Sequence, residues 1–149
     1  MSESLSYEQD LAQYGSLTYT IVGTSMLPLL RQQRDLVTVV AKEGRCRVGD
    51  VVLYRRPPSH WVLHRVVEVL PEGYLTLGDN CVARERVAED DVIAIMTGYV
   101  RGGRDHTVDE AAYRAYVWIL VATERPRVLA KRVLLAARRK VLAAIRHGQ

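Results

Sequence analysis

The sequence has few cysteines and no long apolar segment, so it lacks the disulfides, metal sites and membrane anchors that stabilise or tether many small domains. Its 149 residues include no phenylalanine and only two cysteines, Cys46 and Cys81, which are too few for a disulfide framework and do not have zinc-site spacing. The longest apolar run, residues 115–122, is far shorter than the roughly 20 residues of a membrane-spanning helix. The N-terminus also lacks the basic and apolar regions of a signal peptide. We therefore expect no metal, no cofactor, no transmembrane segment and no signal peptide.

Lysine is also scarce, and the positive charge is unevenly distributed. Of 21 basic residues only Lys42, Lys131 and Lys140 are lysine. Residues 125–149 contain eight basic and no acidic residues, so the net charge of +4 combines a basic tail with a body of net charge −4. The 48% hydrophobic content is that of one folded domain rather than a disordered chain.

Most of the chain has the pattern of a β domain. A helix is expected over residues 4–14, ended by Gly15. Short β-branched runs separated by turn residues then predict six strands: Tyr19–Val22, Leu36–Val40, Val51–Tyr54, Trp61–Val69, Tyr74–Leu77 and Val92–Val100. Pro71-Glu72-Gly73 predicts a hairpin between the fourth and fifth strands. Residues 1–104 thus read as a mostly β, mainly antiparallel domain with a short N-terminal helix.

Residues 105–149 have a helical pattern and form a C-terminal extension that is basic from residue 125. The sequence Thr107-Val108-Asp109-Glu110 has the form of a helix-starting capping box. The first helix is expected to end near Glu124, and Pro126 is expected to interrupt the helical path before a second segment that ends near Arg146.

The second of these helices has a broad apolar face and a basic face. Two interpretations remain open: the apolar face packs on the β domain, or the helix binds an anionic membrane surface. The second would make the protein peripherally membrane-associated rather than simply cytoplasmic. Nucleic acid is not an expected partner, because no aromatic residues alternate with the arginines.

A serine lies in a turn directly after the first expected strand. Gly23 permits a sharp turn and Pro28 prevents the strand from continuing, which leaves the Ser25 hydroxyl accessible. Ser25 is either an ordinary turn residue or a nucleophile, and a nucleophilic serine needs a base.

Few residues can supply that base. Lys42 lies in a turn, where a solvated charge is the simplest interpretation, so a Ser/Lys pair is poorly supported. His60 and His64 would be separated by roughly 13 Å along a strand, too far to bind one metal ion. His64 lies between valines on a face expected to be buried, where it is either a core residue or a general base.

A carboxylate that orients the base could come from several places. Asp79 lies in Gly78-Asp79-Asn80, which is also a common turn sequence. Glu85 and the pair Asp90-Asp91 follow.

Five segments, taken together and in order, resemble the conserved boxes of the S24/S26 clan of serine peptidases, which includes signal peptidase I. The resemblance covers residues 20–104, and its segments are Ser25-Met26-Leu27-Pro28, Arg34-Asp35-Leu36-Val37, Val48-Gly49-Asp50-Val51-Val52, Leu63-His64-Arg65-Val66-Val67 and Leu77-Gly78-Asp79-Asn80.

This resemblance implies a β-rich signal-peptidase/LexA-like fold and a serine endopeptidase that cleaves extended leader or signal peptides after small residues. It implies Ser25 as the nucleophile and His64 as the base, as in the histidine subtype of archaea and the endoplasmic reticulum. The third catalytic residue would be Asp79, with Glu85 as the alternative. Met26 and Pro28 are assigned to the substrate-binding site.

Two other functions remain open. One is a non-catalytic module on the same fold that binds peptides or a membrane surface. The other is a self-cleaving repressor-like regulator, which is disfavoured because the sequence has neither a helix-turn-helix domain nor a suitably placed lysine.

Overall fold

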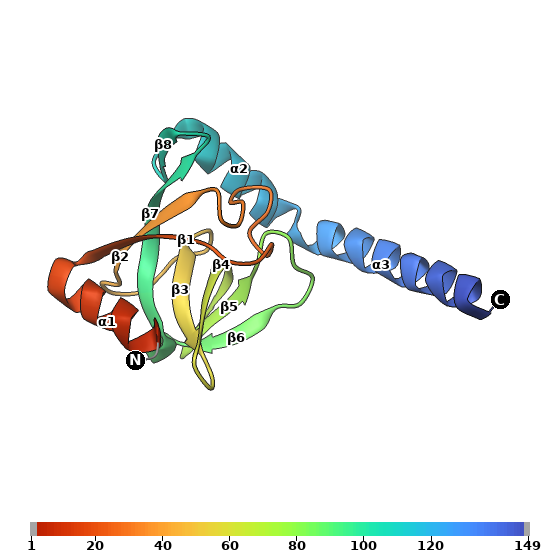
Figure 1. Ribbon diagram of the computed structural model, residues 1–149, viewed down its shortest axis with the longest axis horizontal. Helices are drawn as coiled ribbons and strands as arrows, with labels where there is room; N and C mark the ends of the chain where they lie inside the picture. The colour runs from red at the N-terminus through yellow and green to blue at the C-terminus, as the bar shows by residue number, and fades with distance from the viewer. Residues whose placement is uncertain (1–2, 148–149) are drawn as a thin grey trace.

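The computed structural model describes residues 3–147, which form a strongly twisted antiparallel sheet flanked by helices (Figure 1). Eight strands make up the sheet in the order β1-β2-β7-β3-β4-β5-β6, and β8 pairs with β7. The elements in chain order are α1 (Glu3–Tyr14), β1 (Ser16–Thr20), β2 (Leu36–Ala41), β3 (Val51–Arg56), β4 (His60–Leu70), β5 (Gly73–Leu77), β6 (Glu85–Ala88), the 3-10 turn η1 (Glu89–Asp91), β7 (Val92–Arg101), β8 (Arg104–Thr107), α2 (Ala111–Ala122) and α3 (Glu124–His147).

The expected fold class is confirmed: a mostly β domain with a short N-terminal helix and C-terminal helices. The hairpin of β4 and β5 pairs Leu70 with Gly73, as predicted. The first strand was placed too late, because β1 ends at Thr20 and the chain then turns toward Ser25. Strands β6 and β8 were not predicted, since both are only four residues long, β6 has two charged residues and β8 has no apolar residue. Strand β8 also crosses the domain boundary expected at residue 104.

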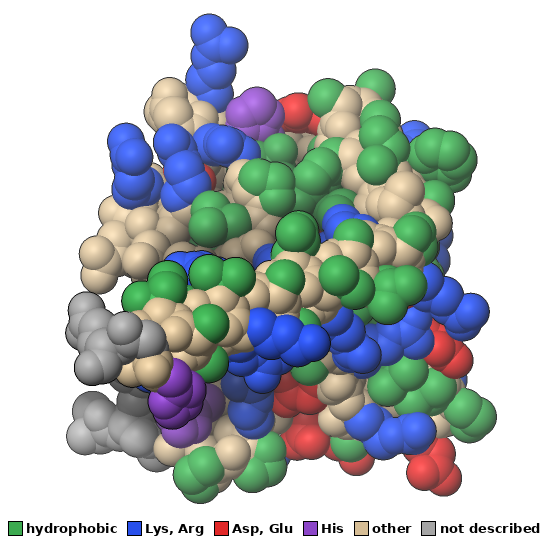
Figure 2. Space-filling view, turned by 90° about the vertical axis from the view of Figure 1, so that its right-hand side faces the viewer, with side chains coloured by type: hydrophobic (Ala, Val, Ile, Leu, Met, Phe, Trp, Pro, Cys, Tyr) green, Lys and Arg blue, Asp and Glu red, His purple; other side chains and the backbone are tan. Residues whose placement is uncertain are grey.

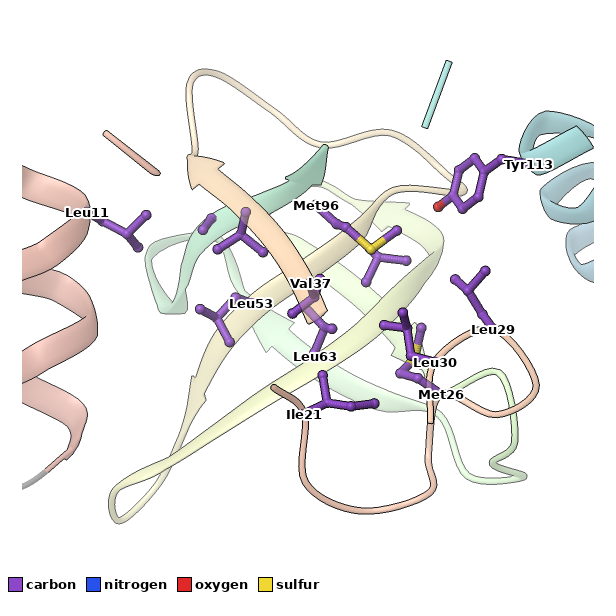
Figure 3. Close-up of a cluster of buried hydrophobic side chains, with 13 residues drawn as sticks. Leu11, Ile21, Met26, Leu29, Leu30, Val37, Leu53, Leu63, Met96 and Tyr113 are labelled. Atoms are coloured by element: carbon purple, nitrogen blue, oxygen red, sulfur yellow. The ribbon is translucent and has the colours of Figure 1, made fainter. Parts of the chain in front are cut away.

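Buried side chains cover both faces of the central strands. On one face, α1, the segment of residues 21–30 and α2 enclose a core that includes Met26, Leu53 and Leu63 (Figure 3). On the other face, Val52, Tyr54 and other residues form a second cluster inside the curled sheet. Strand β3 alternates between these two cores, which explains why its first four residues are all buried.

The C-terminal helices begin and break at positions that differ from those expected. Helix α2 starts at Ala111 rather than after Thr107, and Glu110 supplies only half of the capping box, by accepting a hydrogen bond from the Thr107 backbone N–H at 3.0 Å. The break falls at Thr123, and Pro126 lies in the first turn of α3, where its missing N–H needs no partner.

Helix α3 contacts the β domain only near its start and then projects away from it (Figure 1). Across the described residues, no helix is both long and apolar enough to cross a membrane.

Candidate active site

Ser25 and His64 line one cleft between the segment of residues 21–26 and the first half of β4. This cleft has a volume of about 390 Å³, and Arg56, Trp61 and Cys81 complete much of its wall. Ser25 is half-buried and His64 is 8% exposed. The two residues on which the sequence prediction depends therefore line the same cleft, although no hydrogen bond joins the Ser25 hydroxyl to the imidazole within residues 3–147.

The strand register aligns four polar side chains on the sheet face that carries His64. His64 pairs with Val52 on β3, so Tyr54, two residues along, is its diagonal neighbour on the same face. Thr76 pairs with Val66 on β4 and with Glu85 on β6, so Thr76 and Glu85 also lie on the face that carries His64. Four adjacent strands thus contribute Tyr54, His64, Thr76 and Glu85 to one polar row.

Hydrogen bonds in this row fix the tautomer of His64. The Tyr54 hydroxyl donates its only proton to Glu85 Oε2 at 2.9 Å. It can therefore only accept at its other contacts, from the Thr76 hydroxyl and from His64 Nδ1, each at 3.2 Å. Nδ1 then carries the ring proton, and the lone pair of Nε2 is available to act as a base.

The electrostatics of the row favour a neutral imidazole beside an ionised carboxylate. Burial lowers the pKa of His64 below its ordinary value of 6.5, and the charge of Glu85 partly offsets this effect. Hydrogen bonds from Arg56 lower the pKa of Glu85 and keep it ionised. Burial raises the pKa of Tyr54, so its hydroxyl stays protonated at neutral pH.

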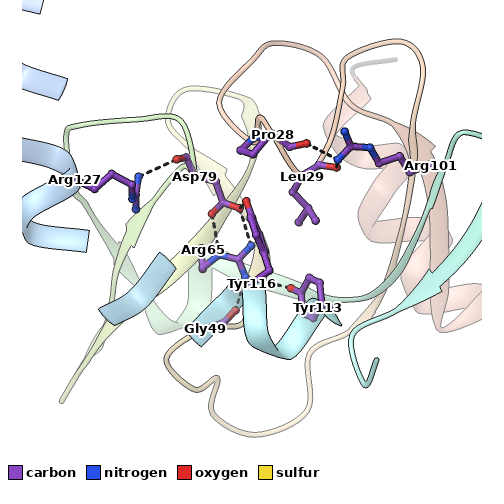
Figure 4. Close-up of polar contacts among 9 residues, drawn as sticks. All are labelled: Pro28, Leu29, Gly49, Arg65, Asp79, Arg101, Tyr113, Tyr116 and Arg127. Atoms are coloured by element: carbon purple, nitrogen blue, oxygen red, sulfur yellow. Dashed lines mark hydrogen bonds and ion pairs between the residues drawn. The ribbon is translucent and has the colours of Figure 1, made fainter. Parts of the chain in front are cut away.

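Asp79 follows Gly78, which lies against His64. The Asp79 carboxylate, however, binds Arg65 and Tyr116, as Figure 4 shows. Its two oxygens accept hydrogen bonds from Arg65 Nε at 2.8 Å and Nη2 at 2.7 Å, and the Tyr116 hydroxyl donates to Oδ2 at 2.9 Å. Arg65 neighbours His64 on β4, so its side chain leaves the opposite face of the sheet. Of the two carboxylates predicted to orient the base, Glu85 is the one connected to it, through Tyr54.

Gly78 allows the loop that carries Asp79 to approach both candidate catalytic residues. A methyl group on Gly78 would lie 2.7 Å from the Ser25 carbonyl oxygen, 2.7 Å from Cys81 Sγ and 3.0 Å from His64 Nε2. The next residues continue this contact, because Asn80 donates from its backbone N–H to the Ser25 carbonyl oxygen at 2.8 Å. Its side-chain amide donates to the Thr24 carbonyl oxygen at 3.1 Å. The loop after β5 thus fixes the position of the turn that carries Ser25.

The first turns of α3 hold the same loop from outside. Arg127 donates to the Asp79 carbonyl oxygen at 3.0 Å, and Lys131 donates to the backbone and side-chain oxygens of Asn80. Arg132 donates to the Val82 carbonyl oxygen at 2.8 Å. A second depression of about 510 Å³ lies between this helix and His64.

The remaining predicted residues take separate places. Met26 is 1% exposed and is mainly a core residue, although it also borders the cleft. Pro28 lines a different depression, beside Tyr99. Lys42 forms an ion pair with Glu89 and not with any group of the cleft. No group of three potential metal ligands occurs in the described part of the chain.

Sequence reasoning missed two residues of the site. The sequence pattern identifies Tyr54 only as the end of an apolar strand. Its spacing of two residues from Val52 could have placed it on the face that carries His64. The contact of Lys131 with Asn80 could not be expected, because nothing in the sequence shows that the first turns of α3 lie against the loop after β5.

The chain was also compared with known proteins. No protein-family model and no curated protein matches it. The functional interpretation therefore depends on the sequence boxes and on the geometry above.

Proposed function

We propose that this protein is a serine endopeptidase resembling signal peptidase I, with Ser25 as nucleophile and His64 as general base. The observation that carries the proposal is that Ser25 and His64 line one cleft, while Tyr54, hydrogen-bonded to Glu85, contacts the imidazole at Nδ1. A neutral, partly desolvated imidazole with a free Nε2 is what abstraction of a serine proton requires.

In the proposed reaction, Ser25 Oγ attacks the scissile carbonyl carbon while His64 Nε2 accepts the hydroxyl proton. The resulting imidazolium is stabilised through Nδ1–H by the Tyr54 oxygen and, beyond it, by the Glu85 charge. His64 then gives the proton to the leaving amine, and water hydrolyses the acyl-enzyme. The backbone N–H groups of Ser25 and Met26 donate no hydrogen bond within residues 3–147, which leaves them available to a developing oxyanion.

An open strand edge supports a peptide as the substrate. Strand β5 pairs with β4 only from Arg65 onward, so residues 60–64 of β4 have β3 on one side and no described strand on the other. This edge borders the same cleft as Ser25. An extended peptide could add to the edge through main-chain hydrogen bonds and present its carbonyl group to the serine. Small residues before the cut are what the family resemblance implies.

Active-site labelling tests the proposal without knowledge of the natural substrate. A β-lactone probe should acylate Ser25, as located by peptide mass spectrometry, and Ser25→Ala should abolish labelling. His64→Ala should slow labelling about 100- to 10,000-fold, the usual contribution of a general base. Ser59→Ala is the matched control, because Ser59 is exposed in the β3–β4 turn and should not affect the rate. Failure of Ser25 to react in the folded protein would leave the non-catalytic binding module as the better interpretation.

A further inference from the structure

The feature with no role in the proposed chemistry is the outer surface of α3. Its large apolar side chains remain in solvent: Leu129 is 64% exposed, Val133 60% and Ile145 60%. The interpretation that this face packs on the β domain is therefore wrong, and the face needs another explanation. A continuous apolar surface of this kind usually marks a binding site.

The apolar face and the residues that bind the loop after β5 lie at different angles around the helix. At 100° per residue, the residues that bind the loop, namely Arg127, Lys131 and Arg132, share one broad side of the helix. The exposed apolar residues centre about 110° around the helix from that side: Leu129, Val133, Leu134, Val141 and Ile145. Ile145 lies in line with Arg127 but about five turns further along, where the helix has left the β domain (Figure 1). Figure 2 shows hydrophobic side chains along one side of this helix and Lys and Arg side chains along the other.

Two residues of α2 extend this face. Backbone hydrogen bonds from Thr123 N to the Ile119 carbonyl oxygen (3.0 Å) and from Arg127 N to the Thr123 carbonyl oxygen (2.9 Å) carry the helical path across the break. With that register, Trp118 and Ile119 fall on the same side as Leu129. Trp118 is 72% exposed, an unusual position for a large indole in contact with water alone, and tryptophan prefers the membrane–water interface.

We propose that this face, made of Trp118, Ile119 and the exposed apolar residues of α3, docks on an anionic lipid surface. Charge complementarity favours this occupant: residues 125–149 carry eight basic and no acidic residues. At 100° per residue, Arg138 borders the apolar face, and Arg139 and Arg146 lie on the basic face across the helix. A helix with this composition lies in the plane of the interface, with its apolar side among the acyl chains and its arginines among the phosphates.

A second copy of the helix fits the same face poorly. Paired helices would bring eight positive charges from each copy together, and residues 125–147 offer no carboxylate for the interhelical ion pairs that stabilise such contacts. Lipid docking, in contrast, leaves room for the β domain, because α3 projects away from the domain along most of the length that carries the apolar face (Figure 1). The cleft of Ser25 and His64 would then sit beside the membrane.

Vesicle flotation with the full chain tests this inference. The full chain should float with vesicles of phosphatidylglycerol and phosphatidylcholine and not with pure phosphatidylcholine. One variant removes apolar contacts but no charge: Leu129→Gln, Val133→Gln, Val141→Gln and Ile145→Gln. A second removes three charges from the same helix: Arg138→Gln, Arg139→Gln and Arg146→Gln. The matched control removes three exposed charges from the β domain: Arg34→Gln, Arg86→Gln and Arg104→Gln.

The apolar-face variant should lose flotation, the second variant should bind on the order of 100-fold more weakly, and the control should bind like the parent chain. Circular dichroism must show that each variant keeps its helix content. Several results would overturn the proposal: no flotation of the full chain, equal flotation with pure phosphatidylcholine, retained binding in the apolar-face variant, or equal losses in the two arginine variants. A dimer in sedimentation equilibrium that the apolar-face substitutions dissociate would assign the face to a second copy instead. None of these readouts depends on the reactivity of Ser25.

Discussion

The Tyr54 hydroxyl accepts a hydrogen bond from Nδ1 of His64 across 3.2 Å and donates its own proton to Glu85. A neutral hydroxyl thus stands where a catalytic triad has a carboxylate, and the negative charge lies one step further away. The arrangement still fixes the tautomer, and it provides a route by which Glu85 stabilises an imidazolium.

We expect Tyr54→Phe to slow acylation of Ser25 by a β-lactone about 10- to 100-fold, because the imidazolium would lose the hydrogen bond that its Nδ1–H donates. Thr76→Val is the control. It removes another partner of Tyr54, at a cost of about 1 kcal/mol in unfolding free energy, but leaves the contact with His64 intact. Parent-like acylation in Tyr54→Phe would show that the tyrosine does not position the base.

The pH dependence of acylation should report the ionisation of His64. Only the neutral ring can accept a proton, and burial lowers its pKa, so the rate should rise with pH through a midpoint below 6.5 and then level off. Glu85→Gln should move that midpoint to lower pH, because it removes a charge that favours the imidazolium and leaves Arg56 unneutralised. Glu72→Gln, at an exposed residue in the β4–β5 turn, should leave the profile unchanged.

The lowered pKa of His64 also makes the stability of the fold depend on pH. The unfolded chain binds a proton at His64 more readily than the folded chain, so this contribution to stability is complete above pH 6.5 and is lost as the pH falls toward the folded-state pKa. Urea midpoints measured across this range should fall with pH in the parent protein. The fall should be smaller in His64→Gln, which has no group to titrate at this position.

The sequence predicted the strands whose apolar residues repeat, and it predicted that Ser25 and His64 belong together. It could not assign the carboxylate, because the choice depends on which face of the sheet each side chain leaves. Asp79 is nearer in sequence, but it faces Arg65, whereas Glu85 reaches His64 only through the pairing of β3, β4, β5 and β6. The contact between Lys131 and the loop after β5 could not be predicted either, because it is a tertiary contact that leaves no pattern in the neighbouring sequence.

We therefore expect a substitution of Asp79 to lower the stability of the fold more than it shifts the pH midpoint of acylation. Asp79→Asn leaves the Arg65 guanidinium with a weakened partner at a site where both side chains are 2% exposed, so we expect a loss of about 3–5 kcal/mol in urea unfolding. Asp91→Asn breaks a half-exposed pair with Arg55 and should cost about 0–1 kcal/mol. A shift in the acylation midpoint larger than that of Glu85→Gln would instead assign the orienting role to Asp79.

We expect a side chain at position 78 to disturb the turn that carries Ser25. The methyl group of Gly78→Ala would overlap the Ser25 carbonyl oxygen, which Asn80 also holds, so relief would require the serine turn to move away from His64. We expect a loss of about 1–3 kcal/mol in stability and a larger proportional loss of acylation rate. Gly102→Ala is a useful comparison, because that glycine has open space around it and a positive φ of 58°, so it should lose stability without losing reactivity once folded.

The contact between α3 and the loop after β5 predicts that a residue of the helix affects the reactivity of Ser25 from a distance. Lys131→Met removes the hydrogen bonds to the backbone and side-chain oxygens of Asn80, whose N–H holds the Ser25 carbonyl oxygen. Acylation should fall several-fold, about the loss expected for one weakened hydrogen bond, while the midpoint of the pH profile stays in place. Lys140→Met is the matched control, because it removes the same charge from an exposed position on the same helix. Equal acylation rates in the two variants would show that α3 only covers the loop, whereas a loss confined to Lys131→Met would show that the helix positions Ser25 through Asn80.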